Sequence, residues 1–375
     1  MKKFILLILI CSIMLTTCAC ASIFDKQYYQ VEDYVYPVSN DKIDGKTKVK
    51  NLNELKDAIT EIVDNGLTEG QIVFAEEYIG NITDDINNAV WQVRSQNALC
   101  AYCVDDISYE LSKLISYYEV EFNVKYTDIG ISFEDIHRLT YSTGLKDIIY
   151  TAINNLDKKI VLLINKSSYS STALENLIIE TYRQNPLICP VEPSLNIRMF
   201  SGNNAQRLYE IELNYGMNYD DLVRCKEELN NISLFSEEEM KMSDIDKAKV
   251  VFERLSDVEM GEGNSVYNAI IEKCSNSEGV ALAFCALSNA IGLDCVEVYG
   301  NNSFGDYCWN IVKIDSDYFH VNVFDGISAG FLKSDLEMWP YYRWDTYQYP
   351  KCSVTLELDF SQDSTNLVTG SYLNA

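Results

Sequence analysis

The chain has 375 residues, of which 30 are lysine or arginine and 56 are aspartate or glutamate, so its formal net charge is −26. A charge of this sign opposes binding to nucleic acid, or to an anionic membrane through a basic surface. The chain has only two histidines, and no Cys/His cluster has zinc spacing, so we expect no metal site and no cofactor.

The N-terminus predicts export. Two lysines precede the apolar run 4–15, which is too short to span a bilayer as a mature helix and indicates a secretory signal. With the cysteines that follow, the segment resembles a bacterial lipoprotein signal, in which the cysteine after the cleavage site is lipidated. Residues 15–18 favour Cys18, which gives a signal peptide over 1–17, and Cys20 is the alternative. We expect a lipoprotein on the outer face of the cell membrane, or otherwise ordinary secretion.

An internal repeat follows a polar stretch, 18–46, that is interpreted as a tether. Three pairs of similar segments recur at spacings of 90, 88 and 91 residues: 55–59 with 145–149, 96–99 with 184–187, and 118–122 with 209–213. Near-constant spacing predicts a duplicated module. We expect an α+β unit over 47–127 and a second copy over 133–218.

Each copy is expected to contain a helix, a strand, a second helix and further strands. The predicted strands are 71–75 and 160–164, and the predicted second helices are 84–95 and 172–184. Alternation in 119–124 and 210–213 places acids on one face, which is interpreted as solvated. His137, between the copies, is expected on a helix. Cys100 and Cys103 have redox-motif spacing but no thioredoxin-like context, which favours a local disulfide or two core thiols.

A helical lead-in, 219–255, is expected to join the repeats to a third domain over 219–360, followed by a tail at 361–375. Three ordered blocks organise this domain: Ser277-Glu278-Gly279-Val280-Ala281, Tyr307-Cys308-Trp309-Asn310 and His320-Val321-Asn322-Val323-Phe324-Asp325. Over 243–352 the sequence resembles the bacterial transglutaminase-like family, a papain-like fold of cysteine peptidases and amide-transfer enzymes. The resemblance implies a helix packed on an antiparallel sheet, within an α+β fold.

The resemblance also implies that the catalytic residues have been replaced. The family's patterns are Cys-x-Gly-Tyr-Ala, His-Ala-Trp-Asn and His-Val-Asp-x-x-Trp-Asp, so its cysteine falls on Ser277, its histidine on Tyr307 and its aspartate on Asn322. A serine hydroxyl needs a nearby base, and a phenol that titrates near ~10 is a poor proton acceptor at neutral pH. Ser275 and Glu278 also predict a capping box, which would make Ser277 a tolerated first-turn residue.

A shifted pair is the catalytic alternative. Cys274 precedes Ser277 by three residues, and His320 lies on the same strand face as Asn322, so the two could serve an active cysteine peptidase or amide acyltransferase. Cys274 could equally be a small apolar residue or half of a disulfide. Cys295 and Cys308 lie on predicted neighbouring strands and could pair.

A cleft is expected even without catalysis. The helix from 277 is predicted to stop at Gly292, and the strands 295–299, 307–314 and 318–324 follow, which gives a cleft bounded by Ser277, Tyr307, Trp309 and Asn322. The aromatic group 339–344 is expected in the core, with a binding patch as the alternative.

These patterns favour an exported surface protein whose third domain is a pseudoenzyme. Its partner would be a peptide, a cell-wall component or a surface protein, and its membrane link the N-terminal lipid. An active enzyme using the shifted pair and a purely structural envelope protein are the other hypotheses.

Overall fold

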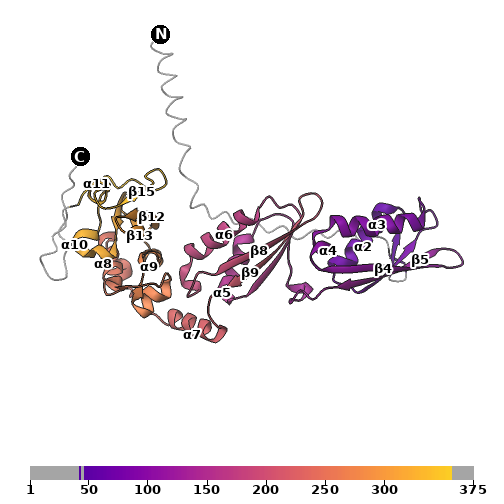
Figure 1. Cartoon of the computed structure of the whole chain (residues 1–375), viewed down its shortest axis with the longest axis horizontal. Coiled ribbons are helices and arrows are strands. Elements are labelled where there is room, and N and C mark those ends of the chain that lie inside the picture. Colours follow the sequence, from indigo (N-terminus) through magenta and orange to yellow (C-terminus); the bar gives the residue numbers. More distant parts are fainter. Residues whose placement is uncertain (1–41, 44–45, 357–375) are drawn as a thin grey trace, which may run out of the picture.

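The computed structural model describes residues 42–43 and 46–356. The predicted signal peptide, both candidate lipidation cysteines and the C-terminal tail lie outside this part of the chain. Within it, no helix combines the length and the apolar character that crossing a membrane requires. Three mixed units follow one another along the chain in Figure 1, with the first in purple, the second in magenta and the third in orange and yellow. The predicted α+β fold class is confirmed.

The first unit is a five-stranded sheet with three helices. The sheet order is β1-β2-β3-β5-β4, formed by β1 (Lys42–Ile43), β2 (Lys46–Val49), β3 (Glu69–Phe74), β4 (Val104–Lys113) and β5 (Tyr118–Tyr126). The helices are α2 (Leu52–Asp64), α3 (Ile82–Gln96) and α4 (Ala98–Cys103). Each helix begins after an asparagine, because the side chains of Asn51, Asn81 and Asn97 accept backbone N–H bonds that the first turn leaves unpaired.

The second unit repeats the order of elements and the strand pairing of the first, without a counterpart of β1 and with a 3-10 turn in the place of α4. It contains β6 (His137–Leu139), α5 (Leu145–Asn155), β7 (Lys159–Ile164), α6 (Ser171–Gln184), the 3-10 turn η2 (Pro186–Ile188), β8 (Ser194–Ser201) and β9 (Arg207–Asn214). Its sheet order is β6-β7-β9-β8. The β6–β7 pair is parallel, as is β2–β3, and the β7–β9 pair is antiparallel, as is β3–β5. The sequence repeat therefore corresponds to two units of one topology.

His137 begins a strand rather than lying on a helix. The short 3-10 turn η1 (Phe133–Asp135) ends just before it, and His137 then pairs in parallel with Leu162 on β7. The helix prediction was wrong because the capping box of Ser132 and Asp135 closes only that single turn.

Glu210 on β9 does not lie on a solvated face, whereas Glu212 is only partly buried. Glu210 has only 2% of its surface exposed, and its carboxylate pairs with Lys159 at 3.0 Å and with Arg198. Glu210 is buried because α4 of the first unit lies against β8 and β9. The helices of the second unit cover one face of its sheet, and α4 covers the other. The same contact explains why the run 160–164 is buried throughout.

Cys100 and Cys103 are core thiols. Both are buried on α4, and the thiol of Cys103 donates to the carbonyl of Leu99 at 3.2 Å. Burial raises the pKa of each to about 12. A protonated thiol at neutral pH is a weak nucleophile, which is consistent with packing rather than redox chemistry.

The third unit, residues 244–356, packs one long helix on an antiparallel sheet. It contains α8 (Asp244–Leu255), β10 (Glu259–Met260), the π-helical turn η4 (Asn268–Glu272), β11 (Cys274–Ser275), α9 (Ser277–Ile291), β12 (Cys295–Asn302), β13 (Gly305–Ile314), β14 (Asp317–Val321), η5 (Val323–Asp325), α10 (Gly326–Gly330), α11 (Asp335–Met338) and β15 (Arg343–Trp344). The sheet order is β14-β13-β12-β15.

Helix α9 ends where the sequence predicts. Gly292 has a left-handed backbone with φ of +88° and returns its N–H to the last turn. The helix is buried along most of its length because Val280, Phe284 and Leu287 share a core with Val312 and Phe319 of the sheet.

The lead-in 219–255 is two helices rather than one. α7 (Tyr219–Asn230) and α8 are separated by a loop that holds η3 (Glu239–Lys241). α7 packs on the core of the second unit through Leu222, Cys225 and Leu229, and Leu282 of α9 reaches the same core. The second and third units are therefore joined by a continuous apolar contact.

Candidate functional site

The start of α9 places Ser277. Asn276 is the N-cap, since its Oδ1 accepts the N–H of Gly279 at 3.0 Å. The predicted capping box was wrong: Ser275 donates to the carbonyl of Gly263 at 2.8 Å, and the carboxylate of Glu278 turns to Arg183. Ser277 is nevertheless the first residue of the helix, as expected.

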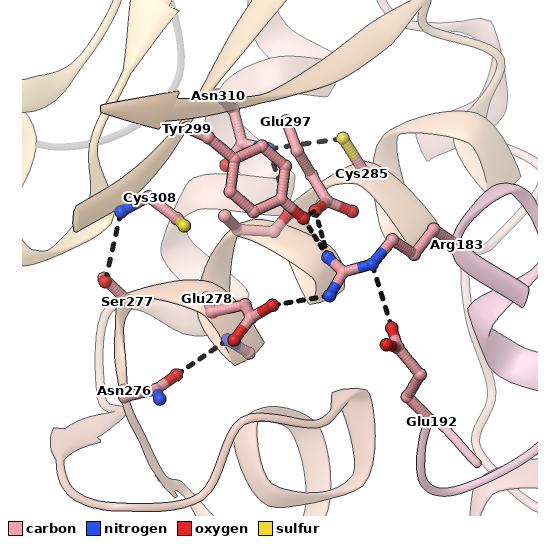
Figure 2. Close-up of polar contacts among 12 residues, drawn as sticks. Arg183, Glu192, Asn276, Ser277, Glu278, Cys285, Glu297, Tyr299, Cys308 and Asn310 are labelled. Atoms are coloured by element: carbon pink, nitrogen blue, oxygen red, sulfur yellow. Dashed lines mark hydrogen bonds and ion pairs between the residues drawn. The ribbon is translucent and has the colours of Figure 1, made fainter. Parts of the chain in front are cut away.

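Strand β13 crosses this helix start. The N–H of Cys308 donates to the hydroxyl oxygen of Ser277 at 3.2 Å, which Figure 2 shows beside the N-cap. Among the described residues, no hydrogen bond joins Ser277 to a histidine or a carboxylate. The serine oxygen is therefore held by a backbone N–H.

Tyr307 starts a chain of directed hydrogen bonds. Its hydroxyl donates to Oδ1 of Asn322 at 3.3 Å, and Nδ2 of Asn322 donates to the hydroxyl oxygen of Tyr342 at 2.8 Å. Tyr342 then donates to the carboxylate of Asp325 at 2.8–2.9 Å. The three donors in this chain point the same way, from Tyr307 toward Asp325. Burial raises the pKa of Tyr307 to about 12, so its phenol remains a donor at neutral pH.

His320 does not meet Cys274. The indole N–H of Trp309 can only donate, so Nδ1 of His320 accepts it at 2.9 Å, and Nε2 carries the hydrogen that is shared with Asp335 at 2.9 Å. His320 is fully buried, whereas Cys274 is exposed on β11, where it pairs with Glu259 of β10. The structure does not bring the shifted pair together.

Another cysteine, Cys352, lies beside His320. Sγ of Cys352 and the ligand atoms of His320 and Asp335 lie within 4.8 Å of one another, a spacing that could hold a metal ion. The hydrogen on Nε2 points at Asp335, so a metal would have to displace it from a histidine whose other nitrogen already accepts a bond. Burial, and then the charge of Asp335, raise the pKa of Cys352 well above its ordinary value, which disfavours the thiolate that a metal needs. The three residues fit a metal poorly.

A cavity of about 720 Å³ opens at the start of α9. Residues of α9, β12, β13 and the β15 segment line it: Asn276, Ser277, Glu278, Tyr299, Gly300, Asn301, Asp306, Tyr307, Cys308, Arg343, Trp344 and Asp345. Ser277 and Tyr307 thus line the cavity as predicted. Trp309 and Asn322 do not, since they are only 1% and 3% exposed and lie behind its wall.

The sequence reasoning missed the wall that β15 supplies. Trp344 pairs with Gly300 of β12, and a Cβ at Gly300 would lie 2.3 Å from the carbonyl oxygen of Arg343 and 2.6 Å from Trp309. Only glycine permits this approach. The aromatic group 339–344 was expected in the core, with a binding patch as the alternative. Tyr342 is buried in the core, whereas Trp339 and Tyr341 are exposed.

Arg183 joins the second unit to the cavity. Its guanidinium pairs with Glu192 at 2.9 Å, with Glu278 at 2.5 Å and with Glu297 at 2.9 Å (Figure 2). Tyr299, a cavity residue, donates to Glu297 at 2.7 Å. Burial raises the pKa of Glu192 and of Glu297, with Arg183 opposing the change. No sequence motif marks Arg183, because its partners are 9 to 114 residues away along the chain.

Comparisons with known proteins give little further guidance. No protein-family model and no curated protein matches the chain. A solved structure described as "Crystal structure of a TGase" matches with a TM-score of 0.21 and 12% sequence identity, over 58% of this chain and 64% of its own. This chain therefore spans slightly less than two thirds of that protein's length, and the structural similarity between the two is weak.

Proposed function

We propose that the third unit is a non-catalytic transglutaminase-like module that binds a peptide, a cell-wall fragment or a surface protein in the cavity beside Ser277. The observation that carries the proposal is the direction of the hydrogen bonds at Tyr307. A residue at the position of the family's histidine would have to accept a proton, and Tyr307 donates one.

The remaining triad positions support the same interpretation. Attack by Ser277 requires removal of its proton, and the contact to its oxygen is the N–H of Cys308. Asn322 presents an amide whose oxygen and nitrogen are both used, toward Tyr307 and Tyr342. An uncharged amide cannot stabilise an imidazolium in place of an aspartate.

The cavity has the size and the lining of a binding site. Its volume of about 720 Å³ lies in the range usual for ligand pockets, about 300–1,000 Å³. Tyr299, Tyr307 and Trp344 offer ring faces together with polar edges, a combination common at peptide and glycan contacts. Arg343 and Asp345 are among the lining residues and bring charges of both signs.

Export and lipid anchoring belong to the same proposal and rest on the N-terminal sequence. Labelling cells with an alkyne-bearing fatty acid should tag the natural protein and its Cys20→Ser variant but not Cys18→Ser. Labelling lost only in Cys20→Ser would move the anchor to Cys20, and no labelling of the natural protein would contradict the anchor.

Calorimetric titration with cell-wall stem peptides and muropeptides tests binding in the cavity. The Tyr307 proton is held by Asn322, but its phenol oxygen can still accept a hydrogen bond from a ligand in the cavity. Tyr307→Phe removes that acceptor, and we expect about a fivefold loss of affinity. Tyr347, which is 99% exposed and not among the cavity residues, provides the matched control Tyr347→Phe, for which no change is expected. Equal affinity of both variants for a fragment that binds would place the ligand elsewhere. Failure of every fragment and peptide to bind would contradict the proposed ligand class.

A further inference from the structure

Two thiols face each other between α9 and β12. Cys285 lies on α9 and Cys295 is the first residue of β12, and their sulfur atoms are 3.2 Å apart. A disulfide bond requires about 2.05 Å. A closure of roughly 1.2 Å between a helix and the strand that follows it would therefore join them.

Cys308, the partner considered from the sequence, cannot replace Cys285. In the β12–β13 ladder Cys308 lies opposite Tyr299, whereas Cys295 lies opposite Val312. Four residues of strand separate Cys295 from Tyr299, which is about 13 Å. That distance exceeds the reach of a disulfide between two cysteines, about 7 Å between their Cα atoms.

We propose that Cys285 and Cys295 form a disulfide bond that fixes α9 to β12. The proposal stands on this geometry and does not depend on the proposed function. The two thiols would be oxidised by a small disulfide such as oxidised glutathione.

The surroundings hold Cys285 in place and leave Cys295 accessible. Nδ2 of Asn310 on β13 donates to the sulfur of Cys285 at 3.2 Å and to the carbonyl of Ala281 at 2.9 Å. Figure 2 shows Cys285 and Asn310 together, next to the Arg183 cluster. Cys285 is buried, whereas Cys295 is partly exposed, and both lie at a cavity of about 420 Å³ that Arg183 also lines.

The order of attack follows from this difference in exposure. The Cys295 thiolate attacks one sulfur of oxidised glutathione and releases one glutathione thiolate. The Cys285 thiolate then attacks the Cys295 sulfur of the mixed disulfide and releases the second glutathione. The two cysteines lose two electrons and two protons, and one molecule of oxidised glutathione takes them up and becomes two molecules of reduced glutathione. Burial raises the pKa of Cys285 well above its ordinary value, which makes it the poorer first nucleophile.

The bond would hold two walls of the candidate cavity together. α9 carries Ser277 at its start, and β12 carries Tyr299. Closing a loop between residues ten positions apart also restricts the unfolded chain. We therefore expect the oxidised protein to melt about 5 °C above the reduced protein.

Peptide mapping of the folded chain tests the proposal directly. The protein is incubated with oxidised or reduced glutathione, its remaining thiols are alkylated, and it is cleaved with an endoprotease that cuts before aspartate. Asp294 and Asp306 then place Cys285, Cys295 and Cys308 on three separate peptides. Cys274 shares a peptide with Cys285, so mapping is done on Cys274→Ser.

The expected result is a linked pair of peptides containing Cys285 and Cys295, lighter by two hydrogens, only after oxidation. Cys295→Ser should abolish both the link and the shift in melting temperature, while Cys274→Ser keeps both. Alkylation of Cys285 and Cys295 after oxidation, or a link from Cys295 to Cys308, would overturn the proposal. Mapping in the Cys274→Ser background decides the matter even if Cys295→Ser folds poorly.

Discussion

The third unit contains two groups of side chains that can be compared with a cysteine-histidine-aspartate site. One group is accessible to solvent but lacks these residue types, and the other has the residue types but lies in the core. At the cavity, Ser277 and Tyr307 have access to solvent, and neither supplies a nucleophile with a base. In the core, Cys352, His320 and Asp335 supply all three residue types, and the thiol and imidazole are fully buried. The difference teaches that residue type does not define a site without exposure and a suitable direction for each proton.

The core group should matter for stability more than any cavity residue. His320→Ala removes a buried ring with two hydrogen bonds and leaves Trp309 without an acceptor. We expect a loss of about 3 kcal/mol in the free energy of unfolding, measured by urea titration. Ser277→Ala is the matched control at the cavity, with a change of about 0.5 kcal/mol or less. An unchanged stability in His320→Ala would show that the core group is not structural.

Gly300 tests whether β15 builds the cavity wall. Gly300→Ala places a methyl group against the carbonyl of Arg343 and the ring of Trp309, so we expect a loss of about 2 kcal/mol and weaker ligand binding. Val296→Ala, at an exposed position on the same strand, should change stability by less than about 1 kcal/mol. Similar effects of the two changes would mean that β15 can move away from β12.

Tyr342 tests the hydrogen-bond chain that makes Tyr307 a donor. Tyr342→Phe leaves Nδ2 of Asn322 without its acceptor and Asp325 without its donor. A cost of about 1–2 kcal/mol is expected in urea titrations. Tyr341→Phe, at an exposed neighbouring position, serves as control and should cost almost nothing. Equal stability of both variants would indicate that the chain is not formed in solution.

The smallest effect is expected from the carboxylates around Arg183, as a pH dependence of the free energy of unfolding. Because burial raises the pKa of Glu297 in the folded chain, the folded state binds more protons than the unfolded state between the ordinary and the raised value. The stability from this group is complete below its ordinary pKa of 4.5 and declines as the pH rises through the raised value. Glu297→Gln should flatten this part of the stability profile, measured by urea titration across pH. An unchanged slope would contradict the shift.

Local patterns predicted most of the elements near the site. The C-cap at Gly292, the start of α9 at Ser277 and the repeat of strands and helices follow from short-range signals in the sequence. The capping box at Ser275 failed because Asn276 is one residue closer to the helix and caps equally well.

The residues that sequence reasoning missed are brought in by contacts distant along the chain. Arg183 lies 95 residues from Glu278. Strand β15 pairs with β12 although β13, β14 and two short helices lie between them in the sequence. The interpretation of Glu210 failed for a related reason, since a strand's alternation cannot reveal that another unit covers its polar face. The pairing of His320 with Asp335 likewise depends on folding of the segment after β14.

If the cavity binds a ligand without turnover, restoring the family's three catalytic residues should create an activity that the natural protein lacks. The natural protein and the triple variant Ser277→Cys, Tyr307→His, Asn322→Asp are assayed side by side for amide hydrolysis and amine transfer on cell-wall peptides. We expect no turnover by the natural protein and measurable turnover by the triple variant. Turnover by the natural protein that is lost in Ser277→Ala or in Cys274→Ala would contradict this expectation.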